Sequence, residues 1–173
     1  MRRIGSILAV ICAATALVSL APLAHAHQGV DLTSSETTPE RGPLLVDGTV
    51  SFAVRTEIAT GDKRGFRFRL DQGDTLAVQL LIVDEAPGNT VGPSQLPRVT
   101  ITDPRGHTIR MLINERTEFY EPYGGTNYLY LSRVEREAIQ GTYSVRISGR
   151  SSVPVETVIG VGYREVPGEV RRR

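Results

Sequence analysis

Hydrophobic and polar side chains alternate with a period of two along several stretches of this chain. Phe66, Phe68 and Leu70 are separated by Arg67 and Arg69, which is the pattern of a strand with one buried face. Residues 50–54 follow the same alternation, and the more continuously apolar residues 75–83 predict a central strand. Further strands are predicted at residues 98–102, 108–113, 128–131, 142–147 and 157–163.

Turn-forming residues separate these stretches, including Gln72-Gly73-Asp74, residues 86–97 and Gly124-Gly125. Only residues 133–138 have a pattern that allows a helical turn. About eight short strands without a strand–helix–strand rhythm indicate an all-β chain. The expected fold is a single β-sandwich of jelly-roll or immunoglobulin-like kind.

The first 26 residues have the three parts of a secretory signal peptide. Arg2 and Arg3 provide the positive start, residues 7–20 are apolar and uncharged, and Ala24-His25-Ala26 is a small-x-small cleavage site. The apolar run is shorter than the roughly 20 residues that span a bilayer, and no second candidate follows it. We therefore expect a secreted protein, extracellular or in the cell envelope, that starts at His27 and has no transmembrane segment.

The remaining chain divides by composition into three parts. Residues 27–43 are polar and turn-rich and predict a flexible N-terminal arm, residues 44–167 form the β-sandwich domain, and residues 168–173 form a solvated basic tail. The single cysteine, Cys12, lies inside the signal, so disulfides cannot stabilise the domain. Without Arg2 and Arg3 there are 18 basic and 19 acidic residues, a balance that disfavours nucleic acid as a partner.

Four short segments appear in an order that resembles the bacterial pre-peptidase C-terminal domain family, a group of small secreted β-sandwiches. The segments are residues 66–70, 72–76, 99–106 and 141–147. The resemblance covers roughly residues 48–163, and it implies an accessory role beside a secreted enzyme, such as adhesion or substrate contact. Residues 121–128 and 160–165 are also similar to segments of uncharacterised exported bacterial β-sandwich proteins.

An aromatic cluster next to the Gly124-Gly125 hinge is the main candidate for binding. It comprises Phe119, Tyr120, Tyr123 and Tyr128. Exposed aromatic rings can stack on sugars or contact a protein partner, so this loop predicts a surface for a protein or a polysaccharide. The alternative is that Tyr128, together with Tyr130 on the same strand face, packs into the core.

Two metal sites are conceivable from the residue types. His27 at a mature N-terminus offers an amine and an imidazole, and His107 would add a second imidazole, a donor set that suits copper. Asp71 and Asp74 flank a tight turn and could contribute oxygen ligands to calcium. The alternative to copper is that His27 is merely the residue next to the cleavage site. The alternative to calcium is a local role, since aspartates in turns commonly bond the nearby backbone.

Catalytic motifs are absent from the sequence. It contains no Gly-x-Ser-x-Gly, no His-Glu-x-x-His and no phosphate-binding glycine loop. Glu115, Glu118 and Glu121 could supply the carboxylate pair of a small glycan-cleaving enzyme, or form a solvated rim of charge. The sequence favours a secreted, non-catalytic binding or structural module, with a copper-binding protein as the alternative and the enzyme third.

Overall fold

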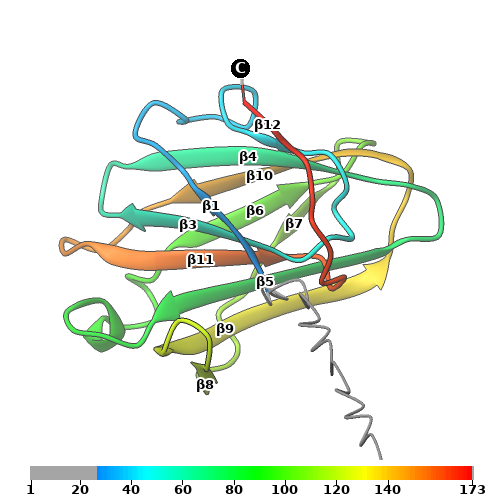
Figure 1. Ribbon diagram of the computed structural model, residues 1–173. Helices are drawn as coiled ribbons and strands as arrows, with labels where there is room; N and C mark the ends of the chain where they lie inside the picture. Colours follow the sequence, from blue (N-terminus) through cyan, green and yellow to red (C-terminus); the bar gives the residue numbers. More distant parts are fainter. Residues whose placement is uncertain (1–26, 173) are drawn as a thin grey trace, which may run out of the picture.

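The computed structural model describes residues 27–172 as two six-stranded β-sheets packed face to face (Figure 1). One sheet, sheet A, has the strand order β1 (Gln28–Asp31), β3 (Phe52–Ile58), β11 (Val155–Val161), β5 (Thr75–Val83), β9 (Thr126–Glu137) and β8 (Thr117–Glu121). The other, sheet B, has the order β12 (Val170–Arg171), β2 (Leu44–Leu45), β4 (Lys63–Leu70), β10 (Gly141–Ser148), β6 (Arg98–Thr102) and β7 (Thr108–Arg110). A 3₁₀ turn, η1 (Gly88–Thr90), follows β5.

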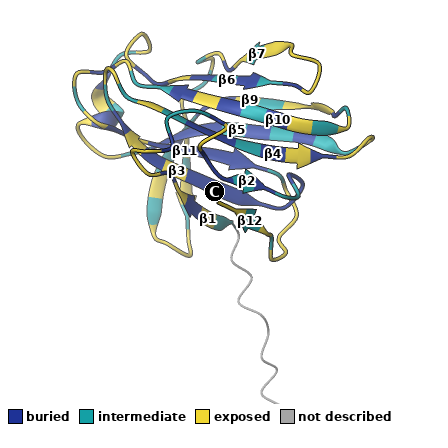
Figure 2. Cartoon of the chain, turned by 90° about the horizontal axis from the view of Figure 1, so that it is seen from above, coloured by how far each residue is buried: buried dark blue, intermediate teal, exposed yellow. Residues whose placement is uncertain are grey.

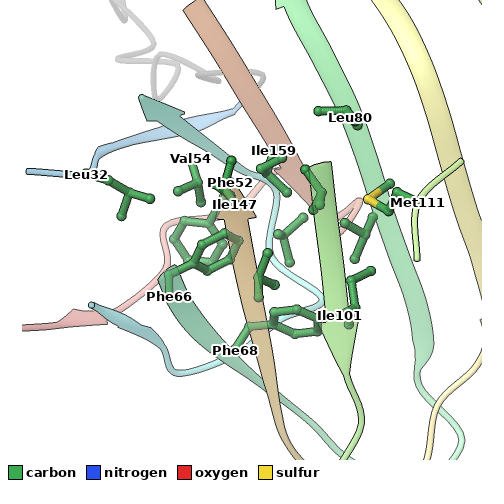
Figure 3. Packing of buried hydrophobic residues seen from close by; sticks show 14 of the residues in the cluster. Leu32, Phe52, Val54, Phe66, Phe68, Leu80, Ile101, Met111, Ile147 and Ile159 are labelled. Carbon is green, nitrogen blue, oxygen red and sulfur yellow. The ribbon is translucent and has the colours of Figure 1, made fainter. Parts of the chain in front are cut away.

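The core lies between the two sheets and is built from alternate residues of each strand. Phe66, Phe68 and Leu70 point inward from β4, as their spacing predicts. Figure 3 shows the two phenylalanine rings among side chains of the core, including aliphatic ones from the facing sheet. Tyr143 from β10 stacks on Phe68, with ring centroids 5.2 Å apart and planes inclined by 4°. Burial of these apolar side chains is the main stabilising contribution, because no disulfide is available.

The prediction of a single all-β sandwich is confirmed, but residues 27–172 form twelve strands instead of about eight. All eight predicted strands are present. The four additional strands are β1, β2, β8 and β12, which are short or lie at sheet edges. No helix long and apolar enough to cross a membrane occurs among residues 27–172.

The segment 27–43, predicted as a flexible arm, is instead part of the sandwich. Its strand β1 pairs in parallel with β3, from Gln28 opposite Phe52 to Asp31 opposite Arg55. Val30 is buried in the core, which gives this short strand a hydrophobic anchor that the polar composition concealed. The expected signal peptide, residues 1–26, lies outside the described residues.

The expected basic tail is likewise part of the sandwich within the described residues. Strand β12 pairs with β2, and the Gln28 side chain exchanges two hydrogen bonds with the backbone of Gly168, at 3.1 and 2.9 Å. The Arg172 guanidinium bonds to the Glu36 carboxylate and donates to the Asp31 carbonyl at 2.8 Å. The two ends of the described chain therefore run side by side and close one side of the sandwich, and β1 and β12 are neighbours in both views (Figures 1 and 2).

Residues 133–138, which allowed a helical turn, continue strand β9 as far as Glu137. Nine residues of β5 pair with this long strand, and the register shifts between Leu80 and Leu81. The charged residues of the segment lie at the exposed end of β9. Pairing with a central strand thus overrides a weak local preference for helix, as tertiary context commonly does.

Candidate functional site

A second apolar cluster lies outside the core, on the outer face of sheet A. Ala53, Leu81 and Val158 point away from the opposite sheet and yet expose only 6–8% of their surface. The outward face of a sandwich strand normally carries polar side chains. These three residues are covered by partly buried aromatic side chains from the neighbouring strands, namely Phe119, Tyr128 and Tyr130.

The strand register explains how residues far apart in sequence meet on this face. Arg55, Val158, Leu81, Tyr130 and Thr117 form one row across five adjacent strands.

The next row contains Ala53, Gly160, Gln79 and Arg133. Gly160 has no side chain and Ala53 has only a methyl group, so the surface is low in the middle of this row. Longer side chains on either side of this low region rise above it. The outer face of sheet A therefore has a depression with a floor and walls.

Three aromatic rings form the wall on the β8–β9 side. Phe119 lies opposite Tyr128 in the strand pairing, with ring centroids 6.5 Å apart, and its centroid is 5.4 Å from that of Tyr130. The guanidinium of Arg133 covers the Tyr130 ring at 3.9 Å from its centroid and pairs with the Glu115 carboxylate at 3.3 Å. Burial raises the pKa of the Tyr130 hydroxyl, the Arg133 charge opposes the shift and Glu115 adds to it.

Floor and walls enclose a cavity of about 470 Å³. Its lining includes His27 from the β1 edge and Glu121, Tyr123 and Gly124 from the turn between β8 and β9. Strands β1 and β8 are the opposite edges of sheet A. Residues from both edges reach the same cavity, which makes the outer face concave, and the volume is within the range of small-molecule sites.

The turn at the rim of the cavity is held by its own carboxylate. Glu121 accepts hydrogen bonds from the backbone N–H groups of Tyr123 at 2.8 Å and Gly124 at 2.6 Å. Gly125 has a φ of +69°, in the left-handed region that favours glycine. This arrangement presents Tyr123 with 75% of its surface exposed, next to the opening.

His27 stands at the other side of the opening. Its Nδ1 lies 2.5 Å from the Ser51 hydroxyl oxygen. Burial lowers the pKa of the imidazole, the carboxylates of Glu165 and Glu121 oppose this, and the Arg55 charge reinforces it. Burial is the largest of these effects, so His27 favours its neutral form.

The cavity continues into a second hollow with an acidic lining. This hollow shares Arg55, Glu121, Gly124, Tyr128 and Val158 with the first. Its carboxylates come from strands β1, β3, β8 and β11 and from the loop after β5; they are Asp31, Glu57, Glu85, Glu121 and Glu156. Arg55 is the one basic residue in this lining, so the hollow has a strongly negative character.

The four predicted aromatic contact residues are divided by the structure. Phe119 and Tyr128 line the cavity and Tyr123 stands at its rim. Tyr120 alternates with Phe119 along β8 and therefore points to the other side of that strand, where it is 57% exposed. The segment expected to be a loop is a strand and a tight turn. Tyr128 and Tyr130 do share one strand face, which is the outer face of sheet A.

The structure does not bring the two predicted copper ligands together. His27 lies beside β3 on the outer face of sheet A, and His107 lies in the turn between β6 and β7 at the far edge of sheet B. The ring nitrogen Nδ1 of His107 is 3.1 Å from the Asp103 carboxylate, whose other oxygen accepts a backbone hydrogen bond from His107 at 2.9 Å. His107 therefore has a local role in its turn.

The predicted calcium ligands are also engaged locally. The Asp74 carboxylate accepts the backbone N–H of Asp71 at 2.7 Å, which closes the β4–β5 turn. The Asp71 carboxylate faces the Gln140 amide at 3.5 Å. Within residues 27–172, no group of three or more His, Cys, Asp or Glu side chains is close enough to hold a metal ion.

The three candidate glutamates do not form a pair across the cavity. Glu115 is bound to Arg133, and Glu121 holds the β8–β9 turn. Glu118 points to the side of β8 opposite Glu121, because the two residues are three positions apart on a strand.

Several residues of the site have no counterpart in the sequence-based prediction: Ala53, Arg55, Gln79, Leu81, Val158 and Gly160. A signal for two of them was present. Leu81 interrupts the alternation of β5 and Val158 that of β11, since each is apolar at an outward position. No protein-family model matches the chain, and a comparison with curated proteins finds no significant match.

Proposed function

We propose that this protein is a non-catalytic binding module, and that the cavity on sheet A receives a bulky apolar side chain from an extended, positively charged segment of a partner protein. The secretory signal expected in residues 1–26 supports a contact at the cell surface or in the surrounding medium. The observation that carries the proposal is the apolar floor of Ala53, Leu81 and Val158, on a face that neither sheet of the described residues 27–172 covers.

The arrangement of the rings favours an inserted side chain over a stacked sugar. A sugar platform needs aromatic faces that are open to the ligand. Here Phe119 packs against Tyr128 and Tyr130, and Arg133 covers the Tyr130 ring. The remaining space is therefore an open cavity with a mainly apolar lining instead of a flat surface.

The acidic hollow beside the cavity defines the charge of the partner. Asp31, Glu57, Glu85 and Glu156 would attract lysine or arginine side chains that flank the inserted residue. Such a segment would satisfy both parts of the site at once, with its apolar residue in the cavity and its charges along the hollow.

A short lysine-rich peptide with one central tryptophan is a direct probe, because the protein contains no tryptophan of its own. Insertion should shift the tryptophan emission to the blue as the protein is titrated. A peptide with alanine in place of tryptophan, measured by competition with the probe, should bind at least tenfold more weakly. A peptide with glutamate in place of lysine should also bind at least tenfold more weakly.

The matched variants are Ala53→Leu and Ala77→Leu. Both residues point outward from sheet A, but only Ala53 lines the cavity. Ala53→Leu should abolish the emission shift and Ala77→Leu should keep it. A peptide response that is unchanged in Ala53→Leu would refute the proposal. Glycan oligomers that bind to the wild type but not to Ala53→Leu would move the assignment to a polysaccharide.

A further inference from the structure

The two sheets differ sharply in charge, although the whole chain is nearly neutral. The six strands of sheet B contain eight basic residues and no acidic one. The six strands of sheet A contain seven acidic and three basic residues. The balanced total of the sequence therefore conceals two faces of opposite sign.

The alternation of each strand directs most of the charges of sheet B to its outer face. Phe66, Val99, Ile109 and Ile147 point inward, so their neighbours in sequence point to solvent. The resulting surface, termed the basic face, carries Lys63, Arg67, Arg98, Arg110 and Arg146. Arg69 belongs to the same face of β4 but lies beside Asp71 and Asp74 at the end of the strand, and it is not included.

The basic face is not consumed by ion pairs of the fold. None of its five cationic side chains forms a salt bridge within residues 27–172. The Arg67 Nε donates to the Pro39 carbonyl at 2.9 Å, which fixes that side chain. Hydrogen bonds from its own backbone and from the Thr38 side chain lower the pKa of the exposed Glu40 carboxylate. The charges of Arg146 and Arg67 lower this pKa by a smaller amount, so both cations lie near Glu40.

The cations stand in a regular array with hydroxyl groups between them. In one row Arg110 and Arg146 flank Thr100, and in the neighbouring row Arg98 and Lys63 flank Ser148.

Flanking positions are two strands apart, which corresponds to about 10 Å. Thr102, Thr108 and Ser144 continue the hydroxyl pattern in a third row beside Arg67. Guanidinium groups bind carboxylates through two parallel hydrogen bonds, and the hydroxyls can bond to sugar oxygens.

We infer that the basic face binds an acidic polysaccharide, a sugar chain with carboxylate groups at regular intervals. The spacing of the cations, about 10 Å, corresponds to about two sugar units, so neighbouring cations can meet every second carboxylate of a chain in which each unit is acidic. The face carries no aromatic side chain, which single-stranded nucleic acid needs for base stacking and a membrane surface needs for anchoring. This site is on the sheet opposite the proposed peptide site and does not depend on it.

Polygalacturonate immobilised on a biosensor is the probe, and its fully methyl-esterified form is the matched polymer without charge. The wild type should bind the acid at physiological salt and should bind the ester at least tenfold more weakly. The double variant R110Q/R146Q should lose at least tenfold in affinity for the acid. R116Q/R136Q removes the same charge at exposed positions outside sheet B, and it should bind as the wild type does.

All four substitutions are at exposed or partly exposed side chains, so unchanged thermal midpoints should confirm that the variants are folded. Equal losses in both double variants would show attraction by net charge alone and overturn the inference. Tighter binding to single-stranded or duplex DNA, or to vesicles of anionic phospholipid, would overturn it in favour of those partners. The tryptophan-peptide titration should be unchanged in R110Q/R146Q, which separates failure of this site from failure of the peptide site.

Discussion

Leu80 and Leu81 are neighbours on β5 and provide a test of whether the outer face of sheet A has an open cavity. Leu80 is fully buried in the core between the sheets, whereas Leu81 is 6% exposed and borders the cavity of about 470 Å³. Each Leu→Ala substitution removes three carbon atoms, which corresponds to about 2 kcal/mol of lost burial. At Leu80 the substitution also leaves a closed void, and the total should be about 3–5 kcal/mol.

At Leu81 no closed void forms, because the space left by the removed atoms joins the cavity that this residue lines. Leu81→Ala should therefore cost only about 2 kcal/mol, a difference of at least about 1 kcal/mol from Leu80→Ala. Equilibrium unfolding in urea measures both values, and the slopes of the two unfolding curves should agree. Equal losses at the two positions would mean that Leu81 belongs to a closed core, and the argument for a ligand cavity would fail.

Three further predictions concern stability. Tyr143→Phe keeps the buried ring but removes the hydroxyl that bonds to the N–H and C=O of Ile139, so unfolding in urea should show a loss of about 1–3 kcal/mol, while the exposed Tyr163→Phe should change little. The pKa of His27 is lowered in the folded protein, so as the pH falls this residue is protonated in the unfolded chain before it is protonated in the folded one. The unfolding free energy should therefore decrease below a pH of about 6.5. A His27→Gln variant with the same pH profile as the wild type would contradict this. Gly162 has a φ of +77°, and a Cβ there would lie 2.2 Å from a backbone oxygen, so Gly162→Ala should lower the thermal midpoint by several degrees.

The strands with regular alternation could be predicted from the sequence, and the short edge strands could not. Residues 75–83 and 98–102 were predicted with the bounds that the structure shows. Strands β2 and β12 have two residues each, too few to show a period, and they form because partners from distant parts of the chain lie beside them. Strand β8 carries aromatic and acidic residues on both of its faces, so its sequence shows no apolar–polar alternation. It lies at the edge of sheet A and pairs only with β9.

Part of the candidate site was predictable, because the residues concerned are close together in the sequence. Phe119, Tyr123 and Tyr128 are close in sequence, so their clustering was visible without a structure. The floor of the cavity was not, because Ala53 and Val158 are about a hundred residues apart and meet only through the pairing of β3 with β11. Proximity between β3, β11 and β5 depends on strand order, which no local pattern encodes.

The sequence by itself determined the all-β class, the positions of eight strands and the inward face of the strands that alternate regularly. Those properties depend on the alternation of side chains along a single strand. The tertiary structure alone decided the order of the strands in each sheet, and with it the concave outer face of sheet A and the contrast in charge between the two sheets. Both features are sums over strands that are remote in sequence, so a nearly neutral chain can fold into a molecule with one acidic and one basic face.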